Sequence, residues 1–224
     1  MALKLPTGSN QERKFTPQAN LEAGTYPGRV VQLIDFGLQP QKPFMGKDKP
    51  PANELGVTYE LLDEFMKDEA GKDIEDKPRW VSESFPVHPL FAENAKSTKR
   101  FKALDPNDEW EGDITKMLTM PLNVTIVNNV VGDKVYDNVA LTSAMRPKDA
   151  EKAPPLKNEP KFFDLDAPDL AVFNSFPKWI QDKIKSNLNF QGSPLQKLLG
   201  ESAEPAAKKE APKKGQETAD NSPY

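Results

Sequence analysis

The side chains that most often carry enzyme chemistry are scarce in this sequence. Its 224 residues include no cysteine and a single histidine, His88, with no second group that we can assign to orient it. Thiolate metal sites, cysteine nucleophiles and histidine-rich metal sites are therefore excluded. Neither a glycine-rich phosphate loop nor a G-x-S-x-G elbow occurs. We accordingly expect a protein that is not an enzyme and that uses no cofactor and no metal.

Carboxylates are the one catalytic resource that remains. The segment Glu60–Asp76 holds eight of them against only two lysines. A pair such as Asp63 with Glu64 has the oxygen ligands that Mg²⁺ prefers, so a magnesium-dependent nuclease is a third hypothesis. We interpret the segment instead as the solvated tip of a β-hairpin, which is the ordinary role of a charge run.

Aromatic and cationic side chains are interleaved along the predicted strands and their connections. This combination suits a single-stranded nucleic acid, because bases stack on aromatic rings at about 1–3 kcal/mol each while Lys and Arg neutralise phosphates. Neither contact requires a particular base, so we expect binding that is independent of sequence. The side chains predicted to stack are Phe44, Tyr59, Trp80 and Phe85. The side chains predicted to contact phosphates are Arg29, Lys42, Lys47, Lys49, Arg79, Lys96, Lys99 and Arg100.

The net charge of the chain does not itself indicate a nucleic-acid-binding protein, because it is −4. Positive charge is clustered instead, around Lys42–Lys49 and Lys96–Lys102. No apolar run is long enough for a membrane span, and the first twenty residues lack the apolar core of a signal peptide. We expect a soluble protein of the cytoplasm without a membrane partner.

Composition divides the chain into four parts. The polar residues 1–20 are predicted to form a flexible arm, and residues 21–146 hold the β-rich patterns. Prolines in a charged context predict an extended strap, followed by a helix, over residues 147–200. Residues 201–224 bury too little to order themselves and are predicted to be a disordered tail.

Runs of β-branched and aromatic residues, one alternating segment and a Gly132-Asp133 turn signal predict five strands with a helix between the third and the fourth. The expected elements are strands at Tyr26–Phe36, Leu55–Leu62 and Trp80–Val87, a helix at Leu90–Leu104, a turn at Ile114–Leu118, and a hairpin of Leu122–Val131 with Lys134–Ala144. This order is that of an OB-fold, a mainly β, five-stranded Greek-key barrel whose second and third strands bind oligonucleotides. Other small barrels and α+β sandwiches share the order and remain alternatives.

An amphipathic helix is predicted after the strap. Ser175 is a candidate N-cap, and Phe176, Ile180, Ile184 and Leu188 recur every four residues behind it. The simpler interpretation is that this stripe packs on the barrel. The alternative is a contact with a neighbouring subunit, which would make the protein self-associate.

A series of short blocks resembles, in order and spacing, the single-stranded DNA-binding proteins of tailed bacteriophages. The blocks are Tyr26–Arg29, Asp35–Gln39, Gly46-Lys47, Tyr59–Leu61, Lys77–Ser82, Trp110–Gly112, Tyr136–Val139 and Phe176–Gln181. The likeness covers roughly residues 24–188. It implies an OB-fold that coats single-stranded DNA during phage replication and recombination.

The resemblance also implies a C-terminal tail that recruits phage replication proteins. Pro223 and Tyr224 look like the proline-aromatic tip through which such tails dock on partners. The tail departs from the usual acidic pattern, because four lysines precede its last eight residues. The alternative function, from another class, is an OB module that recognises protein in a phage assembly and binds no DNA.

Overall fold

Five long strands follow the predicted order in the computed structural model, which describes residues 18–200. The protein is mainly β, with the elements β1 (Gly24–Gln39), β2 (Ala52–Lys67), β3 (Asp73–Pro86), α1 (Lys96–Lys102), β4 (Pro121–Val131) and β5 (Lys134–Ala144). The helix predicted at Leu90–Leu104 is confirmed only as the seven residues of α1, because turns occupy the positions before it. A short 3₁₀ helix lies at Ile114–Met117, where a turn was predicted.

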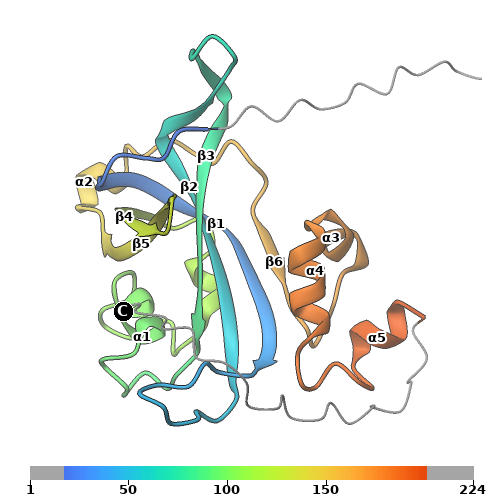
Figure 1. The fold of residues 1–224 in the computed structure, drawn as a ribbon. Helices are drawn as coiled ribbons and strands as arrows, with labels where there is room; N and C mark the ends of the chain where they lie inside the picture. The colour runs from blue at the N-terminus through green and yellow to red at the C-terminus, as the bar shows by residue number, and fades with distance from the viewer. Residues whose placement is uncertain (1–17, 201–224) are drawn as a thin grey trace, which may run out of the picture.

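The strands form one sheet in the order β3-β2-β1-β4-β5 (Figure 1). Strand β1 pairs with β2 along one edge and shares its other edge between two partners. Residues Gly24–Arg29 pair antiparallel with β4, and Gln32–Ile34 pair in parallel with the short strand β6 (Lys161–Phe163). The pairing of β1 with β2 is irregular between Val30 and Gln32, close to the point where β1 changes partner on its other edge.

The two ends of the sheet approach each other, because side chains bridge β3 and β5. Arg79 of β3 forms an ion pair with Asp137 of β5, with 3.4 Å between Nη2 and Oδ2. Arg100 of α1 donates to Glu83 of β3 at 2.6 Å and to the carbonyl oxygen of Val139 in β5 at 3.2 Å. The sheet thus curls around its inner face, although β3 and β5 form no backbone ladder within residues 18–200.

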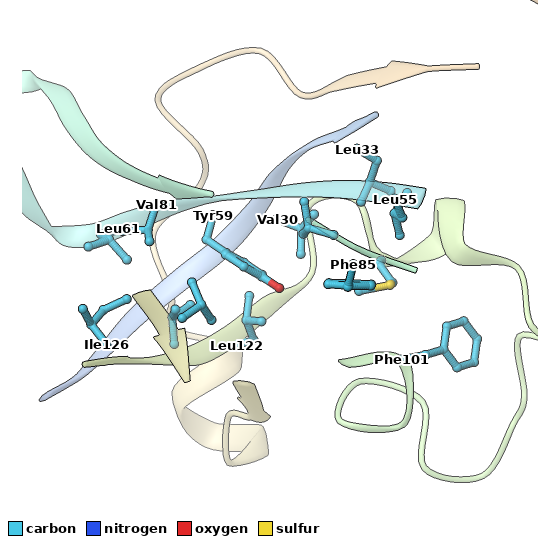
Figure 2. Close-up of a cluster of buried hydrophobic side chains, with 14 of the residues drawn as sticks. Val30, Leu33, Leu55, Tyr59, Leu61, Val81, Phe85, Phe101, Leu122 and Ile126 are labelled. Atoms are coloured by element: carbon cyan, nitrogen blue, oxygen red, sulfur yellow. The ribbon is translucent and has the colours of Figure 1, made fainter. Parts of the chain in front are cut away.

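The inner face of the curled sheet carries the first hydrophobic cluster (Figure 2). In β2, β3 and β4 the residues that point into it share one parity, as the period of two in a strand requires. In β1 both Val30 and Leu33 do so, because the irregularity between Val30 and Gln32 switches the parity. The ring of Tyr59 lies in the middle of this cluster, with an exposed fraction of 0%. Its labelled neighbours in Figure 2 are Val30, Leu33, Leu55, Leu61, Val81, Phe85, Phe101, Leu122 and Ile126.

The opposite, outer face of the sheet is covered by the C-terminal third of the described chain (Figure 1). After α2 (Pro147–Ala150), residues 151–160 form a strap that leads to β6. Three short helices follow, which are α3 (Leu170–Ser175), α4 (Lys178–Lys185) and α5 (Pro194–Leu198). A second hydrophobic cluster joins them to the sheet, consisting of Ile34, Phe36, Phe163, Phe173, Phe176, Ile180, Ile184 and Leu195.

The predicted stripe of apolar residues packs on the sheet rather than on a neighbour, since Phe176, Ile180 and Ile184 are buried in this second cluster. The helix that carries the stripe begins later than expected. Ser175 does not cap it but ends α3, where its hydroxyl donates to the carbonyl oxygen of Val172 at 2.7 Å. Leu188 lies beyond α4 and is exposed.

Gly56 of β2 offers a test of how tightly the outer face is packed. An added Cβ would lie 2.6 Å from Cε2 of Phe36, closer than two carbons can approach, whereas at Gly24 the nearest atom outside its chain neighbours is Cε2 of Tyr26 at 3.8 Å. We expect Gly56→Ala to lower the free energy of unfolding by about 1–3 kcal/mol, as overpacking does. Urea denaturation measures the change. Gly24→Ala is the matched control, and equal stabilities for the two variants would contradict the packing described.

Candidate functional site

A row of three side chains crosses the outer face of the sheet from β1 to β3. Arg29 is the register partner of Glu60, and Glu60 is the register partner of Trp80. Directly opposed residues on neighbouring strands project to the same face, so the three side chains lie side by side. The strap of residues 151–160 is hydrogen-bonded to Arg29 and Glu60 of this row.

Glu60 is the centre of the row and is completely buried, with an exposed fraction of 0%. Its carboxylate accepts hydrogen bonds from the backbone N–H of Lys157 at 2.6 Å and of Asn158 at 3.3 Å. It also accepts from the side-chain amide of Asn158 at 2.7 Å and from the indole N–H of Trp80 at 3.2 Å. A buried carboxylate is stable only with such donors, so Glu60 fixes both the strap and the orientation of the Trp80 ring.

Arg29, which was predicted to contact phosphate, holds the same strap from its other side. Its guanidinium donates to the carbonyl oxygens of Thr119 at 2.8 Å, Ala153 at 2.9 Å and Pro154 at 2.7 Å. The fork of donors in arginine suits several carbonyl oxygens at once. Arg29 is therefore part of the framework that holds the strap.

A groove of about 570 Å³ lies next to this row, between the outer face of β1–β3 and helix α4. Its floor follows β3 from Trp80 through Ser82 to Ser84 and includes residues of β1 and β2. Its other wall comes from the end of α3 and from α4. The lining residues are Gln32, Ile34, Phe36, Gly56, Val57, Thr58, Trp80, Ser82, Glu83, Ser84, Lys161, Ser175, Phe176, Pro177, Trp179, Ile180 and Lys183.

Two indole rings from different elements line the groove. Trp80 of β3 is 43% exposed although its N–H is fixed by Glu60, and Trp179 of α4 is 64% exposed. Contiguous exposed apolar surface is limited on most proteins, so two exposed indoles along one groove make it a candidate site of interaction. One of them belongs to the floor of the groove and the other to the wall formed by α4.

Lysines supply positive charge along the groove. Lys183 lies over the ring of Phe36, with 4.3 Å from Nζ to the centroid, and forms an ion pair with Glu54. Lys161 donates to the hydroxyl of Ser175 at 3.2 Å, and no carboxylate in residues 18–200 forms an ion pair with it. The negative charge of Glu83 at the edge of the groove is offset by Arg100.

The connection between β1 and β2 carries four of the predicted DNA-binding residues, Lys42, Phe44, Lys47 and Lys49, and all four are exposed. Phe44 and Lys47 close a tight turn through two backbone hydrogen bonds of 2.9 and 3.0 Å. The Nζ atom of Lys49 lies 4.6 Å from the centroid of the Phe44 ring. The structure thus groups these residues as a cationic and aromatic loop.

This loop leaves the sheet close to the groove. It starts directly after Gln39, whose side-chain amide donates to the carbonyl oxygen of Lys183 in α4 at 3.1 Å. Lys183 itself lines the groove and donates to the hydroxyl of Ser84 at 3.2 Å. The end of the groove near Lys183 is therefore next to the root of the cationic loop.

Two of the predicted stacking residues are corrected by their burial. Tyr59 and Phe85 belong to the inner cluster, with exposed fractions of 0% and 3%, so no base can reach their rings. The cause is the parity of the strands. Tyr59 shares its face of β2 with Val57 and Leu61, whereas Glu60 points outward. The alternation was visible in the sequence and could have separated core from surface rings.

Two more side chains that were predicted to contact phosphates, Arg79 and Arg100, have partners within the protein, and the burial of Arg100 corrects its prediction. Arg79 donates to the carbonyl oxygen of Ala19 at 2.7 Å in addition to its ion pair with Asp137. Arg100 is buried in the network that joins β3 to β5. Burial opposes its charge, but the hydrogen bonds and the charge of Glu83 outweigh this effect and raise the pKa of Arg100 above its usual value.

Helix α1 keeps its other two predicted cations at the surface. Lys96 forms an ion pair of 3.3 Å with Glu83 while remaining about half exposed, and Lys99 is exposed. The sequence prediction missed Trp179 and Lys161, because both line the groove only after the chain has folded back over the sheet. The one available signal was a large aromatic residue beside, but outside, the apolar stripe of α4.

The predicted C-terminal docking tip, Pro223 and Tyr224, lies outside the described residues, as does most of the predicted N-terminal arm. Residues 18–200 contain no cluster of three or more side chains suited to holding a metal ion. None of their helices is long and apolar enough to cross a membrane. Comparison with protein-family models and with curated proteins gave no match to this chain.

The role of Glu60 can be tested with an isosteric change. In Glu60→Gln an amide replaces a charged acceptor that binds four N–H groups, so we expect a loss of about 1.5–3 kcal/mol in the free energy of unfolding. Proteolysis should also cut the strap of residues 151–160 faster. Glu75→Gln, at an exposed site of β3, is the control. Unchanged stability and unchanged cleavage of the strap would refute this role.

Tyr59 makes the folded protein sensitive to alkali. Burial, and then the negative charge and hydrogen bond of Glu83, raise the pKa of Tyr59 well above its usual value. The folded state therefore binds the phenolic proton more tightly than the unfolded chain does. The stability that Tyr59 contributes is fully present below the unfolded pKa of about 10 and is lost as the pH rises above it.

We expect part of the tyrosinate absorbance of the wild type to appear only together with unfolding. Ultraviolet absorbance and circular dichroism, followed together during an alkaline titration, measure this coupling. In Tyr59→Phe that component should be missing. A full tyrosinate signal in a protein that keeps its native circular dichroism would contradict the burial of this phenol.

Proposed function

We propose that this protein is a non-enzymatic single-stranded DNA-binding protein with an OB-fold, of the kind that tailed bacteriophages use in replication and recombination. The OB assignment is supported by the order of three strands, a helix and two strands, and by the sheet path β3-β2-β1-β4-β5. The side chains that bridge β3 and β5 support it further, because they draw the sheet toward a barrel.

One observation carries the functional proposal. The outer face of β2 and β3, the face on which OB-folds take oligonucleotides, holds a groove lined by the exposed indoles Trp80, on its floor, and Trp179, on the wall formed by α4. Aromatic faces combined with nearby lysines match the two parts of a single strand, which are flat bases and charged phosphates. A double helix offers no free base faces to such a groove.

Binding follows from this arrangement in two parts. Bases enter the groove and stack on Trp80 and Trp179, and the fixed ring of Trp80 is already oriented before DNA arrives, which reduces the entropy lost on binding. Phosphates contact Lys161 and, beyond the end of the groove, the lysines of the cationic loop between β1 and β2. Lys96 and Lys99 extend the positive surface along α1.

The remaining parts of the proposal concern partners and place of action. The protein acts in the cytoplasm of the host cell, where it coats and protects single-stranded DNA. Its C-terminal tip, Pro223-Tyr224, recruits phage replication proteins, and self-association along DNA is a further proposal. The alternative, a module that recognises protein without binding DNA, predicts that partner binding survives changes in the groove.

Titration of oligo-dT at low and high salt, followed by tryptophan fluorescence and by anisotropy of a labelled strand, tests the function. We expect Trp80→Ala and Trp179→Ala each to weaken binding by about 5-fold to 150-fold, the loss of one stacked base. Affinity should fall with rising salt, with a logarithmic slope of about −0.7 for each neutralised phosphate.

Phe91→Ala is the matched control, because Phe91 is exposed but does not line the groove. Its affinity should equal that of the wild type. No binding at low salt, or binding that salt does not weaken, would refute the proposal. Cleavage of the oligonucleotide that starts with Mg²⁺ and stops with a chelator would instead support the nuclease.

A further inference from the structure

The floor of the groove contains a row of three polar side chains that the stacking of bases does not need. Gln32, Thr58 and Ser82 come from β1, β2 and β3 and are register partners of one another. The Nε2 atom of Gln32 donates to Oγ1 of Thr58 at 3.4 Å, and the hydroxyls of Thr58 and Ser82 are 3.0 Å apart. The three groups therefore form one chain of hydrogen bonds across the floor.

The position of this polar row is unusual for a covered face. Gln32 and Thr58 are buried, and Ile34 and Gly56 in the next row toward α4 are apolar. A buried amide is costly unless its donors and acceptor are satisfied. Among the described residues Thr58 is the one partner of the Gln32 amide, through one of its two N–H donors. The Oε1 atom accepts no hydrogen bond from these residues and is not sealed from solvent, so it is accessible from the groove.

An amide with unused hydrogen-bonding capacity in the floor of a groove has a clear complement. The groove volume of about 570 Å³ is within the range of sites that hold small organic molecules, and so has room for a nucleobase. A base stacked against Trp80 presents its edge, which carries donors and acceptors in a pattern that differs between bases. Stacking holds the plane of the base, and the polar row meets its edge.

We propose that the row Gln32, Thr58 and Ser82 reads the edge of one base and gives the groove a preference among bases. This inference rests on the proposed function and goes beyond it, since stacking and phosphate contacts are indifferent to sequence. Gln32 is the principal determinant, because its amide presents a donor and an acceptor together. The hydroxyl groups of Thr58 and Ser82 fix the orientation of that amide.

Thymine and cytosine provide the sharpest comparison. They are pyrimidines of similar size, but thymine has an acceptor at position 4 where cytosine has a donor. Thymine also carries a C5-methyl group, so a difference in affinity between oligo-dT and oligo-dC of equal length reports hydrogen bonding to the extent that removing the Gln32 amide abolishes it. We expect the wild type to distinguish the two by about 5-fold or more, the lower limit for one good pair of contacts.

Gln32→Leu keeps a similar volume but removes the amide, and we expect it to bring the ratio of the two affinities close to 1. Ser82 is exposed, so Ser82→Ala should affect stability less than Gln32→Leu does. It should also bring the ratio of the two affinities closer to 1. Gln41→Leu is the control, because Gln41 lies in the loop between β1 and β2 and does not line the groove. It should leave the ratio unchanged. Thermal unfolding of each variant establishes that it is folded.

The possible outcomes separate the two proposals. Equal affinity of the wild type for oligo-dT and oligo-dC overturns the reading of base edges and leaves the binding function standing. A wild-type preference that survives in both Gln32→Leu and Ser82→Ala also overturns it, because another group must then be responsible. If neither oligonucleotide binds, the proposed function fails and this inference fails with it.

Discussion

The carboxylate of Glu60 imposes the constraint on which the outer half of the molecule depends. It lies without solvent exposure on a central strand, and no cation in residues 18–200 forms an ion pair with it. Its charge is stabilised instead by N–H donors, two of them from the backbone of the strap. The strap must therefore cross the sheet at this row, and its course leads to β6 and to the helices that form the second wall of the groove. One buried charge thus links the sheet to the geometry of the site.

Arginine and lysine side chains differ in where they lie and in what they bind. Arg29, Arg79 and Arg100 each donate to backbone carbonyl oxygens, and two of them also pair with carboxylates. A guanidinium has five donors in a rigid plane and is weakly hydrated, so it is suited to partly buried junctions. Lysine keeps a compact, strongly hydrated charge and remains at the surface. Arg146 is the exception among the described arginines, because it is exposed and pairs with Asp149. The exposed cations of the cationic loop and of α1 are all lysines.

The features predicted well from the sequence are those that local patterns determine. Runs of β-branched and aromatic residues with turn signals located the five strands, and the spacing of Phe176, Ile180 and Ile184 identified the buried side of α4. Alternation within β2 and β3 would have assigned Tyr59 and Phe85 to the core, although both were predicted to stack on bases. Contacts between distant segments left no such local trace. Nothing around Arg29 indicates that it binds carbonyl oxygens of residues 153 and 154, and nothing around Trp179 indicates that it lines the same groove as Trp80.

The parallel pairing of β1 with β6 has a consequence for how the molecule is made. Residues Gln32–Ile34 are synthesised long before Lys161–Phe163. The edge of β1 that pairs with β6 therefore has no partner during most of synthesis. The entropy of closing so long a loop makes this pairing slow compared with the neighbouring hairpins. The strands from β1 to β5 are all synthesised before β6, although β1 and β4 are also far apart in the chain. In order of synthesis the groove is completed last, and a chain interrupted before α4 lacks the wall that carries Trp179.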